Sequence, residues 1–401
     1  MKKIIFLFLI IFLPFIKVNA LTLPTEVDIT ADAIVLLNLD EDEIIYTKNP
    51  DKKEILASLT KIMTAYTVLQ HVDDLDKKIT VTEKDIANLY GFTCAGLEKG
   101  DRVSYLDLLY GTMLISGADA SQTLAIHVGG SIDGFTKLMN EEAKKLGLTN
   151  SHFADSYGGD DNNVSTAREM AYLLKTALEN KTFKKIFSTN YYTMSNGLRV
   201  VNYTASLATF HGLDSELLTG NKSGFTPEAG LLLASTATIN GTNYALIVCK
   251  STINEYKSTH VLDTYKIYNY ISNLTFNKYS LLKKGTILKR IEVENGTISE
   301  YVVTADKEIT AILTPKDYEN LEYKINITDK ITPENKIGDN LGYVDILVNG
   351  ELVDTYHVYL KDEIFKYQKE SKVAIIAIIL LIFISLILLC TNILTINKRK
   401  F

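Results

Sequence analysis

The sequence is poor in the residues that build metal centres and disulfide frameworks. Its 401 residues include three cysteines, six histidines and no tryptophan. The histidines are scattered without the close spacing of zinc ligands, so we expect no metal ion. Cys94 and Cys249, the two cysteines outside the apolar C-terminal segment, could pair, but one bridge would not make a disulfide framework. The formal net charge of −6 gives no indication of nucleic-acid binding, and we expect no cofactor.

Both ends of the chain carry apolar segments of the kind that direct proteins to membranes. Met1–Ala20 combines a basic start, an apolar stretch and the small-residue cleavage site Val18-Asn19-Ala20, which is typical of a signal peptide. Val373–Leu394 is almost entirely apolar, and as a helix it would extend roughly 33 Å, enough to cross a bilayer. Lys398-Arg399-Lys400 follow it and favour a cytoplasmic C-terminus. We therefore expect an exported, single-pass membrane protein whose body is extracytoplasmic.

Residues 21–275 read as one domain of the α+β class. Alternating apolar residues predict an N-terminal hairpin from Ala33–Leu37 and Ile44–Thr47, and a second hairpin around Asn240-Gly241. Between them, residues 74–180 are mostly helical in pattern. Strands at both ends with helices between them indicate an antiparallel sheet packed beside a helical region.

Residues 276–365 read as a second, small all-β domain. Strand patterns dominate from Thr286 to Leu360, with hairpin signals at Asn295-Gly296 and Asn349-Gly350. This domain holds no cluster of candidate catalytic groups, which favours a spacer or interaction role. Residues 366–401 would form the membrane anchor and a short basic tail.

The first chemical motif is the Ser-x-x-Lys pair Ser58 and Lys61, at the start of an apolar, helix-like run. Residues three apart share one helix face, so the hydroxyl and the amine would be neighbours. An amine kept neutral by burial or by another cation can activate a serine as an acyl-accepting nucleophile. The pattern alone is weak, because Ser280 and Lys283 repeat it without any other catalytic feature nearby.

Two further motifs follow in the same domain. Ser116-Gly117-Ala118 lies at the junction of two predicted helices, and Lys222-Ser223-Gly224-Phe225 leads into a predicted strand. The Lys222 ammonium suits a carboxylate, the Ser223 hydroxyl can donate to it, and Gly224 would let a substrate approach the strand closely. Each motif alone also fits a helix break or a surface turn.

The order and spacing of the three motifs resemble the low-molecular-mass penicillin-binding proteins, which are serine D-alanyl-D-alanine carboxypeptidases. The likeness covers roughly Ala31–Ser272, and the export signal, the trailing β domain and the C-terminal anchor also fit the family plan. Further segments that resemble the family are Gly96–Asp101, Leu108–Gly111, Asn140–Ala143, Leu146–Asn150 and Ser165–Met170. The resemblance implies the penicillin-binding, β-lactamase-like transpeptidase fold.

The resemblance also implies a reaction and its catalytic residues. Ser58 would attack the carbonyl between the last two D-alanines of a peptidoglycan stem peptide and form an acyl-enzyme. Lys61 would be the general base, and Ser116, between Lys61 and Lys222, would help to carry the proton to the leaving amine. Penicillins would acylate the same serine. The positive charge of Lys222 would lower the pKa of Lys61.

The resemblance assigns substrate binding to the third motif. Lys222 and Ser223 would hold the terminal carboxylate, and Gly224 would let the substrate lie against the strand. The backbone N–H groups of Ser58 and Phe225 would form the oxyanion hole, in which removing one donor typically costs a factor of about 10²–10³ in rate.

One departure from the family pattern leaves alternative functions open. The second motif is usually Ser-x-Asn, whereas this chain has Ala118, which cannot offer an amide to the substrate. A catalytically weak wall-binding or β-lactam-sensing protein is therefore one alternative. A class A β-lactamase is another, but the Glu-x-x-x-Asn type of segment that it would need is absent between Asp155 and Asn180.

Overall fold

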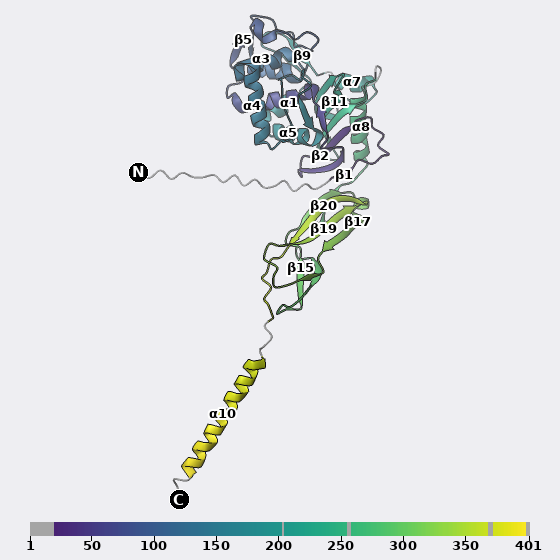
Figure 1. Cartoon of the computed structure of the whole chain (residues 1–401). Helices are drawn as coiled ribbons and strands as arrows, with labels where there is room; N and C mark the ends of the chain where they lie inside the picture. The colour runs from purple at the N-terminus through teal and green to yellow at the C-terminus, as the bar shows by residue number, and fades with distance from the viewer. Residues whose placement is uncertain (1–19, 203, 255–257, 368–371, 398–401) are drawn as a thin grey trace, which may run out of the picture. The chain divides into compact units, whose positions relative to one another are not determined.

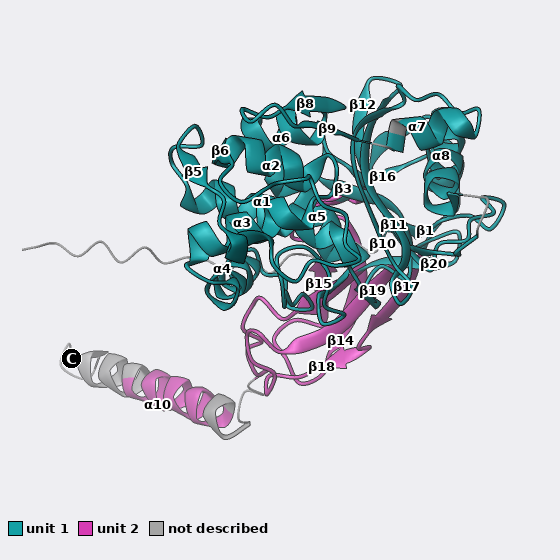
Figure 2. Ribbon diagram, turned by 90° about the horizontal axis from the view of Figure 1, so that it is seen from above, with its two compact units in different colours: residues 1–279, 310–322, 347–354 teal, residues 280–309, 323–346, 355–401 magenta. Residues whose placement is uncertain are grey.

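The computed structural model describes residues 20–202, 204–254, 258–367 and 372–397 (Figure 1). The predicted signal peptide, apart from Ala20, lies outside the described residues. The chain divides into two compact units (Figure 2). The first comprises Met1–Tyr279, Thr310–Glu322 and Leu347–Asp354, and the second comprises Ser280–Ile309, Tyr323–Ile346 and Thr355–Phe401. Three segments of the predicted β domain, 276–279, 310–322 and 347–354, therefore belong to the first unit.

A six-stranded sheet forms the centre of the first unit. Its strand order is β1-β3-β2-β12-β11-β10, antiparallel throughout except for the short parallel pair of β1 with β3. The strands are β1 (Leu21–Thr22), β2 (Ala33–Asn38), β3 (Glu43–Lys48), β10 (Leu218–Thr226), β11 (Gly230–Ile239) and β12 (Thr242–Ser251). Both predicted hairpins, β2–β3 and β11–β12, are present. β10 is the edge strand at one side of the sheet, and it contacts the helical region at η1.

Helices inserted between β3 and β10 form the second part of this unit. They are the 3₁₀ helix η1 (Ala57–Leu59), α1 (Thr60–His71), the 3₁₀ helix η2 (Glu83–Ile86), α2 (Tyr105–Met113), α3 (Ala118–Gly129), α4 (Ile132–Lys145), α5 (Ala167–Glu179), α6 (Lys181–Phe187) and α7 (Thr204–Phe210). Three small ribbons join them: β4 (Lys53–Ile55) with β7 (Val164–Thr166), β5 (Lys78–Thr80) with β6 (Arg102–Ser104), and β8 (Tyr191–Thr193) with β9 (Arg199–Val201). The helix α8 (Thr259–Ser272) closes the domain.

The central strands are buried on both faces because a layer of helices covers each face. Alternate residues of β2 and β12, such as Val35 and Ile247, belong to the same core cluster as α1 and α5. Their neighbours Ile34 and Leu246 are equally buried but point to the other face. There α8 packs on β11 and β12 (Figure 1). The hydroxyl oxygens of Tyr268 and Ser235 are 3.1 Å apart across this contact. This is the α+β arrangement predicted from the sequence.

The second unit is rich in β-structure. Its strands β14 (Ile287–Val293), β15 (Glu300–Thr304) and β18 (Lys330–Ile331) form one sheet in the order β15-β14-β18. The other elements of the C-terminal region are β13 (Asn277–Leu282), β16 (Ile309–Leu313), α9 (Pro315–Glu319), β17 (Leu321–Ile327), β19 (Asn340–Val348) and β20 (Glu351–Tyr359). The small β-rich domain expected after residue 275 is therefore present.

A long helix, α10 (Lys372–Asn397), contains the predicted membrane span Val373–Leu394. Side chains are described only for residues 376–388 of this helix. Within the described part of the chain, no helix is long and apolar enough to cross a membrane. The predicted span extends beyond the described side chains at both ends.

Candidate active site

Ser58 and Lys61 lie on one face at the entry to α1. Ala57 has a left-handed backbone (φ +43°), a strained conformation for a residue other than glycine. The short 3₁₀ turn that follows leads directly into α1, so Lys61 is one turn after Ser58. The buried Lys61 Nζ donates to Ser58 Oγ at 3.0 Å and to the carbonyl oxygen of Tyr157 at 2.6 Å. The structure thus brings the two predicted groups into direct contact.

Ser116 and Lys222 form a second hydroxyl–amine pair. Ser116 lies between α2 and α3 and also has a left-handed backbone (φ +65°). Lys222, buried in β10, donates from its Nζ to Ser116 Oγ at 2.9 Å and to the carbonyl oxygen of Ser223 at 2.7 Å. Two motifs that are about a hundred residues apart in the sequence therefore meet through side chains.

The strand β10 passes directly beside Ser58. A Cβ atom added to Gly224 would lie 3.1 Å from Ser58 N and 3.3 Å from Leu56 O, so glycine permits this close approach. Ser223 is half-buried and Phe225 is exposed on the same strand. Because β10 is the last strand of its sheet, its outer backbone groups are not used by a neighbouring strand. This edge offers an extended ligand a line of hydrogen-bonding groups next to Ser58.

A loop built around Asp155 also contacts Lys61 and the turn that carries Ser58. The sequence alone did not predict a role for this loop. The Asp155 carboxylate accepts hydrogen bonds from the backbone N–H groups of four consecutive residues, Tyr157, Gly158, Gly159 and Asp160, at 2.5–2.8 Å. This turn points the Tyr157 carbonyl at Lys61. A Cβ on Gly158 would lie 1.8 Å from Ala57 O, so the loop also packs tightly on the turn that carries Ser58. The Gly158-Gly159 pair was the available sequence signal.

The Asp119 side chain does not take the place of the asparagine amide that the family usually has at position 118. Its carboxylate accepts backbone hydrogen bonds from Ala95, Gly96, Leu97 and Ala120 at 2.7–3.0 Å. Asp119 is therefore fully engaged in holding the loop that precedes residue 98 against the start of α3. Ala118 itself is buried at the first position of that helix.

Burial makes both lysines unusually weak bases. It lowers the pKa of Lys61 to about 7, while the negative charges of Asp155 and Asp119 act in the opposite direction. Burial also holds the pKa of Lys222 well below its usual range, and the charge of Lys61 lowers it further. Burial of Lys61, rather than the neighbouring Lys222, is thus the main cause of its low pKa, which corrects the prediction made from the sequence.

The cysteines are not joined by a disulfide. Cys94 is exposed and Cys249 is buried in β12, and both are free thiols. Burial raises the pKa of the Cys249 thiol to about 12, so this side chain is a structural apolar group rather than a reactive one. Within the described residues, no group of three or more histidine, cysteine or acidic side chains could hold a metal ion.

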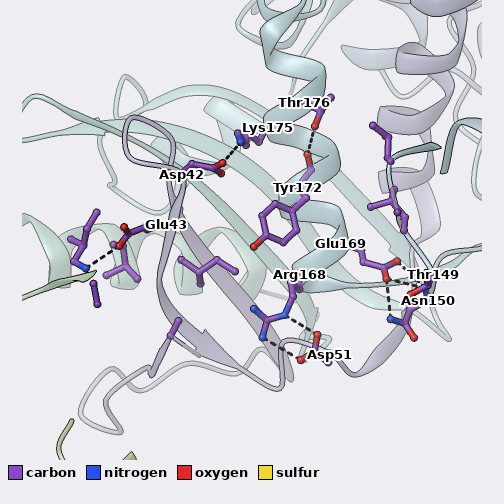
Figure 3. A pocket seen from close by; sticks show the side chains of 18 of the residues that line it. Asp42, Glu43, Asp51, Thr149, Asn150, Arg168, Glu169, Tyr172, Lys175 and Thr176 are labelled. Atoms are coloured by element: carbon purple, nitrogen blue, oxygen red, sulfur yellow. Dashed lines mark hydrogen bonds and ion pairs between the residues drawn. The ribbon is translucent and has the colours of Figure 1, made fainter. Parts of the chain in front are cut away.

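A separate cavity of about 520 Å³ lies in the first unit, and none of the predicted site residues lines it. Apolar side chains such as Leu148 and Ile312 form part of its wall. Figure 3 shows two ion pairs in its wall, Arg168 with Asp51 and Lys175 with Asp42, and a hydrogen bond from Asn150 to Glu169. This cavity is therefore separate from the cluster formed by Ser58, Lys61, Ser116 and Lys222.

Comparison with known proteins agrees with this geometry. The family model described as D-alanyl-D-alanine carboxypeptidase (peptidase family S11) matches residues 19–252. The model of the penicillin-binding protein 5 C-terminal domain matches residues 276–366. The two matches follow each other in the same order as the predicted domains.

Individual relatives match over most of their length. D-alanyl-D-alanine carboxypeptidase DacF of Bacillus subtilis is 26% identical over 84% of this chain and 86% of its own. A D-alanyl-D-alanine carboxypeptidase of a Streptomyces species is 34% identical over 63% of this chain and 89% of its own. The crystal structure of DacD from Francisella tularensis shares the fold, with a TM-score of 0.65 and 21% identity over 87% of this chain and 97% of its own. The chain therefore belongs to the S11 family of D-alanyl-D-alanine carboxypeptidases, the low-molecular-mass penicillin-binding proteins with a C-terminal β-rich domain.

Proposed function

We propose that this protein is a serine DD-carboxypeptidase that removes the terminal D-alanine from peptidoglycan stem pentapeptides. The observation that carries the proposal is the contact of the buried, weakly basic Lys61 with Ser58 Oγ at 3.0 Å, beside the edge strand that bears Lys222. A hydroxyl in contact with an amine whose pKa is near 7 is an activated nucleophile at neutral pH.

In the acylation step, neutral Lys61 takes the proton of Ser58 as Oγ attacks the carbonyl carbon between the two D-alanines. The N–H groups of Ser58 and Phe225 would stabilise the negative oxygen of the tetrahedral intermediate. The C–N bond then breaks, and its nitrogen receives the proton through Ser116, which contacts Lys222. The products of this step are free D-alanine and an ester of Ser58.

In the deacylation step, water attacks the ester carbonyl after giving a proton to Lys61. The ester bond breaks, Ser58 regains its proton from Lys61, and a stem tetrapeptide leaves. The Asp155 loop contributes by holding the Tyr157 carbonyl on Lys61, which fixes the direction of the amine. No cofactor or metal takes part in this scheme.

Substrate selection would depend on the terminal carboxylate. Lys222 is buried and its pKa is held well below its usual range, so the negative charge of a bound carboxylate would favour its charged form. Ser223 would donate a hydrogen bond to the same carboxylate. β-Lactams present a carboxylate and a strained amide in a similar arrangement, and we expect them to acylate Ser58 and inhibit the enzyme.

We also propose that the protein works outside the cytoplasm, attached to the cell membrane by α10, with its C-terminus in the cytoplasm. The large apolar side chains described in α10, from Ile376 to Leu388, are each at least half exposed, as expected for a helix whose side chains face lipid. The attachment would hold the enzyme beside the peptidoglycan that it trims, in a role in cell-wall remodelling.

The decisive test is mass spectrometry of the purified protein acting on a stem pentapeptide. We expect release of D-alanine by the wild type and its loss in Ser58→Ala and in Lys61→Ala. Ser280→Ala is the matched control, because it changes the same kind of motif outside the site, and it should retain full activity. D-alanine release that persists in Ser58→Ala would overturn the assignment.

One observation favours a second function. Ala118 leaves the site without the amide expected to position the substrate peptide, and Asp119 is engaged elsewhere. A protein that is acylated by β-lactams but turns over stem peptides slowly would act as a sensor or wall-binding protein. Intact-mass measurement with benzylpenicillin separates the cases, since an adduct on Ser58 without D-alanine release supports the sensor and excludes the carboxypeptidase.

A further inference from the structure

An exposed apolar cluster lies in the second unit at the turn that joins β14 and β15. We call it the aromatic tip; it consists of Ile298, Phe365 and Tyr367, which are 46%, 61% and 63% exposed. Backbone hydrogen bonds tie its two segments together. Thr297 N donates to Phe365 O at 2.8 Å, and Tyr367 N donates to Asn295 O at 2.8 Å.

The aromatic tip is an ordered part of the domain. Gly296 and Lys366 form an antiparallel bridge, and Ile364, just before Phe365, is buried. A Cβ on Gly296 would lie 2.4 Å from the Val293 side chain, so the turn packs closely on the end of β14. The backbone thus holds large apolar side chains in solvent although a core is available beside them. Such a cluster usually marks a binding surface.

The position of the aromatic tip in the chain indicates its partner. Tyr367 precedes Lys372, the first residue of α10, by five residues. Five residues span at most about 18 Å, so Tyr367 cannot lie further than this from the start of the apolar helix. The headgroup region on one side of a bilayer is roughly 5–8 Å thick. Tyrosine next to a membrane helix is well suited to that region because its ring is apolar and its hydroxyl is polar, and the apolar ring of phenylalanine can lie at the boundary with the acyl chains.

We propose that the aromatic tip rests on the outer leaflet of the membrane, with Ile298, Phe365 and Tyr367 at the level of the lipid headgroups. The inference rests on the proposed anchoring of α10 and adds a second, non-spanning contact to it. Glu294, at the start of the turn, is paired with Lys330 at 2.6 Å and so brings no unpaired negative charge to the surface. The second contact would fix the end of the β domain on the bilayer rather than leave it on a free tether.

The absence of tryptophan makes a direct test available, since each introduced tryptophan is the sole one in the chain. The full chain carrying Phe365→Trp or Tyr367→Trp is reconstituted into phosphatidylcholine–phosphatidylglycerol vesicles. Separate preparations contain lipids brominated high on the acyl chain or near its end. We expect a blue-shifted emission and a loss of emission that is larger with the high bromines, because the ring lies at the headgroup level.

Two further variants make the outcomes distinguishable. Phe383→Trp in α10 reports on the anchor and should be quenched most by the deep bromines. Ile287→Trp is the matched control: Ile287 is 54% exposed and lies at the other end of β14, roughly 20 Å from the turn. Quenching at Phe383→Trp but not at Phe365→Trp or Tyr367→Trp would overturn the inference and leave the anchor intact. No quenching at Phe383→Trp would overturn the proposed anchoring, and equal quenching at Ile287→Trp would exclude a contact limited to the tip.

Discussion

The chain contains the Ser-x-x-Lys pattern twice, and the two copies have opposite surroundings. Ser58 and Lys61 lie at a helix start, where residues three apart share a face, and their side chains are 3.0 Å apart. Ser280 lies in β13, where residues three apart point to opposite faces, and Lys283 follows the end of that strand. Lys283 is exposed, and the Ser280 hydroxyl has no hydrogen-bond partner in the described part of the chain.

The difference shows that the contact between the serine and the lysine, and the pKa of the lysine, depend on the surrounding structure rather than on the Ser-x-x-Lys pattern itself. Burial lowers the pKa of Lys61 to about 7, and the Asp155 loop and the strand bearing Gly224 enclose the turn before it. Lys283, by contrast, is exposed to solvent. Four predictions test this contrast.

The largest difference between the two copies is expected when the lysine amine of each is removed. Lys61→Ala should lower the rate of Ser58 acylation by benzylpenicillin by about 10²- to 10⁴-fold, because a general base is lost. Lys283→Ala should leave the rate unchanged. Stopped-flow or intact-mass measurement of adduct formation gives both rates. Equal rates in the two variants would mean that Lys61 has no special role.

The second prediction concerns the packing around each copy. A glycine-to-alanine substitution adds one methyl group near each copy, and its effect on kcat/KM is compared. In Gly158→Ala the new Cβ would lie 1.8 Å from Ala57 O and displace the turn that carries Ser58. A shift of about 1 Å at a nucleophile can cost roughly 10²-fold in rate. Gly285→Ala, two residues after Lys283, is the matched control, because Gly285 has the same left-handed backbone (φ +87°) but open space around it. If kcat/KM falls equally in both variants, strain rather than displacement of Ser58 is responsible.

The third effect concerns pH. Lys61 acts as a base only when neutral, so kcat/KM should rise with pH through about 7. The negative charge of Asp155 stabilises the ammonium and raises its pKa, so Asp155→Asn should move this acid limb to lower pH. Asp329→Asn, an exposed carboxylate of the second unit, should leave it unmoved. An acid limb that stays in place in Asp155→Asn would show that the carboxylate only holds its loop.

Much of this site could be predicted from the sequence because its parts are local. Ser58 with Lys61, and Lys222 with Gly224, are set by helix and strand periodicity. The contact between Ser116 and Lys222 was expected only from the family resemblance, since no local rule brings residues so far apart together.

The parts that the sequence did not predict depend on backbone geometry. The Tyr157 carbonyl reaches Lys61 because one carboxylate accepts hydrogen bonds from four consecutive N–H groups; the Gly158-Gly159 pair indicates a turn there, but not its contact with Lys61. The role of Asp119 was missed for the same reason. The sequence offered burial or a second cation as the cause of a low pKa at Lys61, and the structure was needed to show that burial dominates.

The smallest effect is expected at Ala118, the position at which the second motif departs from the family pattern. Ala118→Asn would introduce an amide two residues after Ser116. One hydrogen bond from this amide to the substrate peptide would contribute about 0.5–1.5 kcal/mol, which corresponds to a roughly twofold to tenfold gain in kcat/KM. Ala118→Leu, with nearly the same shape and no amide, is the control and should give no gain. Ala118 is buried, so thermal unfolding of both variants shows whether the larger side chain fits. A gain in Ala118→Leu equal to that in Ala118→Asn would show that volume, rather than a hydrogen bond, is what this position lacks.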